Sequence, residues 1–290
     1  MQTTDYGTTG LRVSVLGLGA SELRDADAAT AESVLNAALD LGMTLIDTAH
    51  CYGDSEEKIG RHLRHRRDEY VLATKTGHKL DGVADWTPEA VRGGVEQSLR
   101  LLRTDHLDIV HLHSCDLDVL QAEVVIETLE DLRDAGAIGH IGYSGDNEPL
   151  AWAVRSGRFT SIETSLNLAD QWSLHHVLGE TTDRGIGVIA KRPIANAPWR
   201  HATRPGGTYG EEYWHRMQVL AYEVELDPLE FALRFAAFAP GVSTAITGST
   251  NPDHLTANVA VLARGPLPDD VLAHVARRWA ERGQDFTGLR

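Results

Sequence analysis

Eight short apolar runs recur along the chain, and each ends at or just before Gly, Asp, Ser, Lys or His. The runs are Val13–Leu18, Thr44–Ile46, Tyr70–Thr74, Leu107–Leu112, Ile138–Tyr143, Ser161–Thr164, Gly187–Ala190 and Ser243–Ile246. A short apolar run that stops at a loop is typical of a buried parallel strand. Helical segments separate the runs, and eight is the number of strands that closes an α/β barrel. The pattern therefore predicts a (β/α)₈ TIM barrel.

The helical segments carry start and stop signals. Thr87 is a good N-cap, with Pro88 at the first helical position of the helix that follows. Gly42 can end the predicted helix Ala28–Leu41. The predicted helices are Ala28–Leu41, Pro88–Leu102, Val119–Ala135, Pro149–Ser156, Leu174–Arg184, Pro228–Phe238 and Pro252–Leu262. Residues 1–12 precede the first barrel strand and resemble a β-hairpin with its turn near Gly7–Gly10.

The chain length suits one barrel. It has 290 residues, of which 42% are hydrophobic and 24% charged, and a barrel of this kind needs ~250 residues. We therefore expect a single domain over residues 1–290. The segment Ala195–Gly210, rich in Pro, Gly, Trp and Arg, follows the seventh strand, where long loops are commonly functional.

Charge and cysteine content exclude several function classes. The net charge is −15, from 27 basic and 42 acidic residues, so nucleic acid and anionic membranes are not expected as partners. Two cysteines make no disulfide framework. The first residues lack the basic and apolar regions of a signal peptide, and no run reaches the ~18 apolar residues of a membrane span. The expected location is the cytoplasm, and the sequence says nothing of oligomeric state.

Polar residues at the ends of three adjacent predicted strands form a coherent group. Asp47 ends the second strand and is followed by Tyr52, Lys75 ends the third, and His113 ends the fourth. In a (β/α)₈ barrel the chemistry sits where the strands end, so these four can converge. A tyrosine titrates near ~10, and a lysine ammonium beside it stabilises the phenolate. Asp47 can hold that lysine, and His113 can orient a substrate oxygen.

At this point the sequence resembles the aldo-keto reductase family. The matching segments are Asp47-Thr48-Ala49-x-x-Tyr52-Gly53, Ala73-Thr74-Lys75, Leu107-Asp108-x-x-x-x-His113, Ile141-Gly142-x-Ser144, Pro193-Ile194 and Gly248-Ser249…Leu255…Asn258. They occur in family order over nearly the whole chain. The resemblance implies a catalytic tetrad of Asp47, Tyr52, Lys75 and His113. It also implies an extended NADP(H) held without a Rossmann domain, and reduction of an aldehyde or ketone, or the reverse.

The resemblance also implies a set of cofactor contacts. They are Gly19, Ala20, Ser144, Glu163, Lys191, Arg192, Gly248, Ser249, His254 and Asn258. Glu163 stands where the family has a glutamine that binds the nicotinamide carboxamide, and it can accept from the amide nitrogen but cannot donate. His254 stands where an arginine often holds the 2′-phosphate. NADP(H) is therefore the first expectation, with NAD(H) possible.

The same residues allow other interpretations. Gly17–Glu22 imitates a dinucleotide fingerprint but lacks the third glycine. His111 and His113 alternate on one strand and could face a metal, but Tyr52 and Lys75 beside Asp47 fit a cation-free site better, so no metal is expected. His50, Trp86 and Trp199 are candidate substrate walls. The alternative function is a barrel that binds the cofactor as a redox sensor with little turnover.

Overall fold

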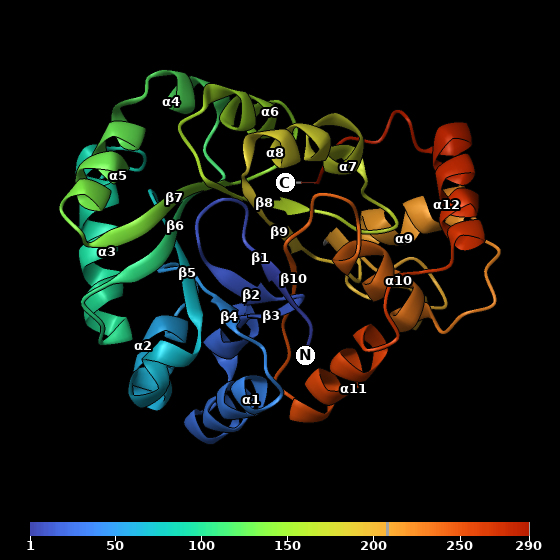
Figure 1. Ribbon diagram of the computed structural model, residues 1–290, viewed down its shortest axis with the longest axis horizontal. Coiled ribbons are helices and arrows are strands. Elements are labelled where there is room, and N and C mark those ends of the chain that lie inside the picture. Colours follow the sequence, from blue (N-terminus) through green and yellow to red (C-terminus); the bar gives the residue numbers. More distant parts are fainter. Residues whose placement is uncertain (207–208, 290) are drawn as a thin grey trace.

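The barrel predicted from the sequence is present. The computed structural model describes residues 1–206 and 209–289, and over these residues eight parallel strands close into a barrel with helices outside it (Figure 1). The strands are β3 (Leu16–Gly19), β4 (Leu45–Asp47), β5 (Val71–Thr76), β6 (Leu107–His113), β7 (Ile138–Ser144), β8 (Ser161–Ser165), β9 (Gly187–Lys191) and β10 (Thr244–Thr247). Each pairs with the next, and β10 closes on β3.

Side chains alternate between the two faces of the strands, as the period of a strand requires. In β6, Val110 and Leu112 pack in the large core between the strands and the helices, whereas Ile109 belongs to a separate cluster inside the barrel. His111 and His113 share the inward parity of Ile109. The same alternation applies to β5, where Val71 and Ala73 lie inside the barrel and Lys75 follows them. Polar residues at the strand ends are therefore directed into the barrel mouth.

The helices surround the barrel, and the one that begins at Pro88 starts at the predicted cap, Thr87. Thr87 accepts a hydrogen bond from the Ala90 amide, and Asp227 caps the helix that begins at Pro228. The helices are α1 (Ala28–Asp40), α2 (Ser55–Leu63), α3 (Pro88–Leu102), α4 (Leu117–Gln121), α5 (Val124–Asp134), α6 (Asn147–Ser156), α7 (Trp172–His176), α8 (Leu178–Arg184), α9 (Tyr209–Leu220), α10 (Pro228–Ala237), α11 (Pro252–Leu262) and α12 (Asp269–Arg282). Short 3₁₀ segments are η1 (Ala20–Asp25), η2 (Arg64–Glu69) and η3 (Pro198–Arg200).

The structure corrects the predicted helices in several places. The helix predicted over Val119–Ala135 is two helices, α4 and α5, because Glu123 between them has a left-handed φ of 61°. The helix predicted over Leu174–Arg184 is likewise divided, into α7 and α8, at Val177. Helices α2, α9 and α12 were not predicted. In the predicted loop Ala195–Gly210, η3 is present and α9 begins at Tyr209, and residues 207–208 lie outside the described part.

The N-terminal hairpin covers the end of the barrel where the strands begin. Its strands are β1 (Thr3–Asp5) and β2 (Arg12–Ser14), so the first predicted barrel strand, Val13–Leu18, combined the end of the hairpin with β3. The Tyr6 hydroxyl lies 2.6 Å from Ser161 Oγ, which lies 2.8 Å from His111 Nε2. This buried chain ties the hairpin to the barrel interior and leaves the opposite end open. Within the described residues no helix is long and apolar enough to cross a membrane.

The hairpin anchor gives a stability prediction. Tyr6→Phe should lower the free energy of unfolding by about 0.5–1.5 kcal/mol, because it deletes one buried hydrogen bond while Ser161 keeps His111 as a partner. Tyr70→Phe is the control, since the Tyr70 hydroxyl makes no hydrogen bond within the described residues. Denaturant unfolding of both variants measures the difference. Equal stability of the two would mean that the hydroxyl of Tyr6 does not anchor the hairpin.

Candidate active site

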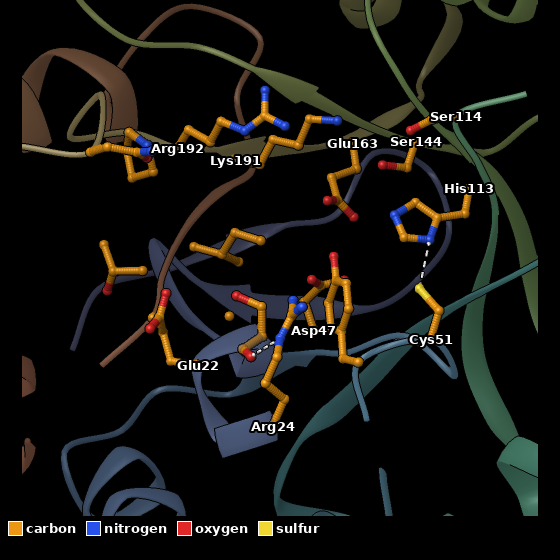
Figure 2. Close-up of a pocket in the computed structure, with 18 of the residues that line it drawn as sticks. Glu22, Arg24, Asp47, Cys51, His113, Ser114, Ser144, Glu163, Lys191 and Arg192 are labelled. Carbon is orange, nitrogen blue, oxygen red and sulfur yellow. Dashed lines mark hydrogen bonds between the residues drawn. The ribbon is translucent and has the colours of Figure 1, made fainter. Parts of the chain in front are cut away.

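A cleft of about 970 Å³ lies at the open end of the barrel, where the strands end. The ends of β3, β4, β6, β7, β8, β9 and β10 contribute, in order, Gly19, Asp47, His113, Ser144, Glu163, Lys191 and Thr247 to its lining. Figure 2 shows Glu163, Lys191 and Arg192 on one side of this cleft and Glu22 and Arg24 on the other. The cleft is therefore the place where the strand-end residues singled out from the sequence meet.

A buried ammonium group between two carboxylates forms the floor of the cleft. Lys75 Nζ donates to both Asp47 oxygens at 2.6 Å and to the Thr48 carbonyl at 3.0 Å. Glu163 Oε2 lies 3.1 Å from the same nitrogen. Although burial disfavours the charged amine, Asp47 and Glu163 together raise the pKa of Lys75 above its ordinary value. Lys75 is therefore a fixed positive charge.

The two carboxylates compete for that one ammonium. Burial and the neighbouring charge of Glu163 raise the pKa of Asp47, against the opposing effect of Lys75. For Glu163, burial also disfavours the ion, but Lys75, His111 and Lys191 outweigh it and lower the pKa. Two acidic groups around one cation leave the cluster with an excess of negative charge whenever both are ionised.

Tyr52 lies on the wall of the cleft beside this cluster. It sits in the turn after β4, where its amide donates to the Ala49 carbonyl and Gly53 takes a φ of +55°. Lys75 Nζ lies 5.4 Å from the centroid of its ring. Burial raises the pKa of Tyr52 to about 12, with Lys75 opposing and the two carboxylates adding to the rise. The phenol is therefore a proton donor at neutral pH rather than a standing phenolate.

His113 lies beside Tyr52 in the cleft. Their ring centroids are 5.8 Å apart and the rings are nearly perpendicular. Burial, and then the charge of Lys75, lower the pKa of His113 well below its usual value. The imidazole is therefore neutral and can donate one hydrogen bond. Its Nδ1 lies 3.5 Å from Cys51 Sγ, as Figure 2 shows.

Ser144 and Glu163 each direct a buried polar atom at the cleft without a hydrogen-bond partner. They are neighbours in the pairing of β7 with β8. Within the described residues, Ser144 Oγ and Glu163 Oε2 make no hydrogen bond, although Oε2 is close to Lys75. A hydroxyl that can donate beside a carboxylate that can only accept is complementary to a primary carboxamide. The residues present therefore fit a nicotinamide at this place.

The far side of the cleft suits a chain of phosphates less well. Gly19 and Gly248 approach so closely that a Cβ on Gly248 would lie 3.0 Å from the Gly19 carbonyl. Beyond them, Ser249 Oγ lies 3.0 Å from His254 Nδ1 near the start of α11. Lys191 is 3.4 Å from Asp146, and Arg192 donates to the Leu289 carbonyl at 2.7 Å. Lys191 and Arg192 are thus already engaged by other groups of the protein.

Some of the predicted contacts do not line the cleft. Ala20 is buried and its carbonyl accepts from Ser55, and Asn258 donates to Thr247. His50 is held between the backbone carbonyls of Lys75 and His78. Trp199 lines a separate pocket, whereas Trp86 does line the cleft. We therefore propose no substrate contact for His50 or Trp199.

Three residues of the site were not identified from the sequence. Asp146 accepts from Thr164 and from the Ser165 amide and pairs with Lys191. His78 lies 4.9 Å from His113 between ring centroids. The guanidinium of Arg24 lies 5.2 Å from the centroid of the Tyr52 ring. Asp146 and His78 each follow a strand end by two residues, so a wider search of the strand-end loops would have found them.

Comparison with known proteins agrees with this geometry. The sequence profile of the Aldo/keto reductase family matches residues 15–279. The uncharacterized oxidoreductase YqkF of Bacillus subtilis is 28% identical, covering 94% of this chain and 95% of its own. L-galactose dehydrogenase of Arabidopsis thaliana is 35% identical over 65% of this chain and 64% of its own length. The solved structure of aldo-keto reductase AKR11C1 from Bacillus halodurans, in its holo form, superposes with a TM-score of 0.85 at 25% identity, and the match covers 96% of each chain.

Proposed function

Because this chain belongs to the aldo/keto reductase family and is an NAD(P)-dependent oxidoreductase, we propose that it reduces an aldehyde or ketone with Tyr52 as the proton donor, and catalyses the reverse oxidation. The observation that carries this proposal is the buried Lys75–Asp47 pair beside Tyr52, on the floor of the same cleft as Ser144 and Glu163. A proton donor and a carboxamide-binding pair thus face one space. We also infer that residues 1–290 act as one domain, and a cytoplasmic location stays a prediction.

The proposed roles of the residues follow from their positions. When bound, the reduced nicotinamide supplies a hydride, and Ser144 and Glu163 would hold its carboxamide. Tyr52 gives its proton to the oxygen of the reduced carbonyl, because it is protonated at neutral pH and reaches the cleft. Lys75, fixed by Asp47, stabilises the phenolate that remains.

His113 serves the substrate oxygen rather than the proton transfer. A neutral imidazole can donate a hydrogen bond to a carbonyl and polarise it without giving up its proton. Its edge-on position against Tyr52 places both donors on the same side of the cleft. The substrate oxygen would then lie between the two groups.

The alternative of a cofactor-sensing barrel would need the carboxamide pair but not the proton donor. The cluster of Lys75, Asp47 and Tyr52 is therefore the feature that favours turnover. A panel of aldehydes and ketones assayed with NADPH and with NADH distinguishes the two. Cofactor binding without turnover of any carbonyl would favour the sensor.

The first functional prediction concerns Tyr52. Tyr52→Phe should lower kcat for carbonyl reduction by about 10²–10⁴-fold, the usual contribution of general acid catalysis. The dissociation constant of the cofactor should stay within about twofold, since the phenol is not among the carboxamide contacts. Steady-state kinetics and cofactor titration measure the two effects. Tyr70→Phe is a control, because that ring lies away from the cleft. A near-normal kcat with a substrate whose chemistry limits the rate would contradict the assignment.

The second functional prediction concerns Glu163 and the oxidation state of the cofactor. The oxidised nicotinamide ring is positively charged and the reduced ring is not, so an ionised carboxylate beside it favours the oxidised form. Glu163→Gln should therefore weaken binding of the oxidised cofactor relative to the reduced one by about tenfold or more, as Coulomb's law at short range implies. Calorimetric titration with both forms gives this ratio without any turnover.

Asp85→Asn is the matched control for Glu163→Gln. It also removes a carboxylate from the lining of the cleft, but its oxygen accepts from the Lys79 amide in the segment between β5 and α3. The control should leave the ratio unchanged. If Glu163→Gln leaves it unchanged as well, Glu163 does not contact the nicotinamide.

The third functional prediction concerns the choice between NADPH and NADH. Because Lys191 and Arg192 are paired within the protein and His254 stands alone beside Ser249, we expect a preference for NADPH below roughly 1,000-fold, or ~4 kcal/mol. His254→Arg should raise that preference, and His254→Gln should not. Direct titration with both cofactors measures it. A larger preference in the wild type would place the 2′-phosphate on another cation.

A further inference from the structure

Three side chains of metal-binding type meet on one wall of the cleft. Cys51 follows β4, His78 follows β5 and His113 ends β6, so three consecutive strands bring them together. The sulfur and the two histidine nitrogens that they offer all lie within 4.8 Å of one another. All three line the open cleft. The mechanism proposed above uses His113 only, and leaves Cys51 and His78 without a role.

One edge of a tetrahedral zinc site is already formed. A zinc ion bound to sulfur at about 2.3 Å and to nitrogen at about 2.0–2.1 Å holds these two atoms about 3.6 Å apart. The distance from Cys51 Sγ to His113 Nδ1 is 3.5 Å. The ring of His78 packs between Trp86 and His113, and its backbone is held by His50. Its ligating nitrogen lies within 4.8 Å of the other two donor atoms, so His78 is the third ligand of the set.

The set of donors selects the kind of cation. One thiolate and two imidazoles suit Zn²⁺ and similar borderline cations, whereas Mg²⁺ and Ca²⁺ take oxygen ligands. The fourth position faces the cleft, where water or a substrate oxygen can enter. A second group of possible ligands, Asp47, His111 and Glu163, is occupied differently. The ammonium of Lys75 lies 2.6 Å from Asp47 and 3.1 Å from Glu163 and repels a cation there.

We propose that Cys51, His78 and His113 form a Zn²⁺ site that inhibits the enzyme reversibly. A zinc ion bound through Nδ1 of His113 offers its open position to the substrate oxygen, in competition with His113 and Tyr52. It also places two positive charges beside Tyr52, whose ring is 5.8 Å from that of His113. A substrate oxygen that binds the ion is no longer held between His113 and Tyr52, which slows reduction, whereas the positive charge by itself would stabilise the phenolate as Lys75 does. The inhibition rests on the proposed function, whereas the binding of the metal does not.

The binding is tested on the full-length protein with metal alone, after treatment with a chelator. Titration with Co²⁺ should give one bound ion per chain and a thiolate-to-cobalt charge-transfer band in the near ultraviolet, and Zn²⁺ should displace it. Cys51→Ser should abolish the band and weaken Zn²⁺ binding by more than the ~10–100-fold typical of losing an outer contact. His78→Ala should weaken binding similarly. Thermal unfolding with and without Zn²⁺ shows that each variant is folded.

Two variants serve as matched controls for the binding. Cys115→Ala removes the other cysteine, which is buried in the core rather than in the cleft. His254→Gln removes a histidine that lines the same cleft but lies beside Ser249. Both should retain the charge-transfer band and the wild-type affinity. A wild-type titration without the band, or equal Zn²⁺ affinity in Cys51→Ser, would overturn the site.

The inhibition is measured with any carbonyl substrate found by the panel above. Zn²⁺ should lower turnover of the wild type at the concentration that fills the site, and a chelator should restore it. Each variant is compared with its own metal-free rate, and Cys51→Ser should need at least tenfold more Zn²⁺. Turnover that is insensitive to Zn²⁺ in a protein that shows the cobalt band would refute inhibition but keep the site. Absence of any turnover would count against the proposed function alone.

Discussion

The ammonium of Lys75, buried between Asp47 and Glu163, is the group around which the open end of the barrel is arranged. A buried charge is costly unless it is paired and hydrogen-bonded, and Lys75 satisfies this with two carboxylates and the Thr48 carbonyl. Because β4, β5 and β8 supply Asp47, Lys75 and Glu163, the cluster links three strands across the floor of the cleft. The positions of Tyr52 and His113 depend on that floor.

The same cluster divides the cleft into regions of different charge. Burial raises the pKa of Tyr52 to about 12, with Lys75 opposing the rise and the two carboxylates around Lys75 adding to it. That value keeps the phenol protonated and suits carbonyl reduction at neutral pH, whereas oxidation needs the phenol to lose its proton. An oxidised nicotinamide ring is positively charged, so an ionised Glu163 beside it would stabilise the oxidised form of the cofactor. Reduction and oxidation are therefore affected in opposite ways by one carboxylate.

The barrel and the meeting of Asp47, Lys75 and His113 could be predicted from the sequence because both follow from a simple period, whereas Tyr52 was expected there from its place after Asp47 and from the family resemblance. Strand ends are visible as apolar runs, and inward positions alternate along each strand, so Asp47, Lys75 and His113 had to meet. The missed features depend on loops. The break at Glu123 requires a left-handed residue that no glycine announces, and α2, which starts at Ser55 directly after the Tyr52 turn, has no proline at its start. The backbone of His78 is held by a hydrogen bond between its carbonyl and the His50 side chain, which leaves no trace in the sequence.

Cys51 and Tyr52 are neighbours in the chain but have different proposed roles. Cys51 precedes Tyr52, yet it points to His113 rather than to Lys75. We propose that a cation is accepted beside Cys51, whereas the ammonium of Lys75 repels one between Asp47 and Glu163. His113 belongs both to the proposed zinc site and to the proposed mechanism, since its Nδ1 faces Cys51 and the same ring is proposed to donate to the substrate oxygen. The residue that orients the substrate is therefore also the one through which a metal would act on turnover.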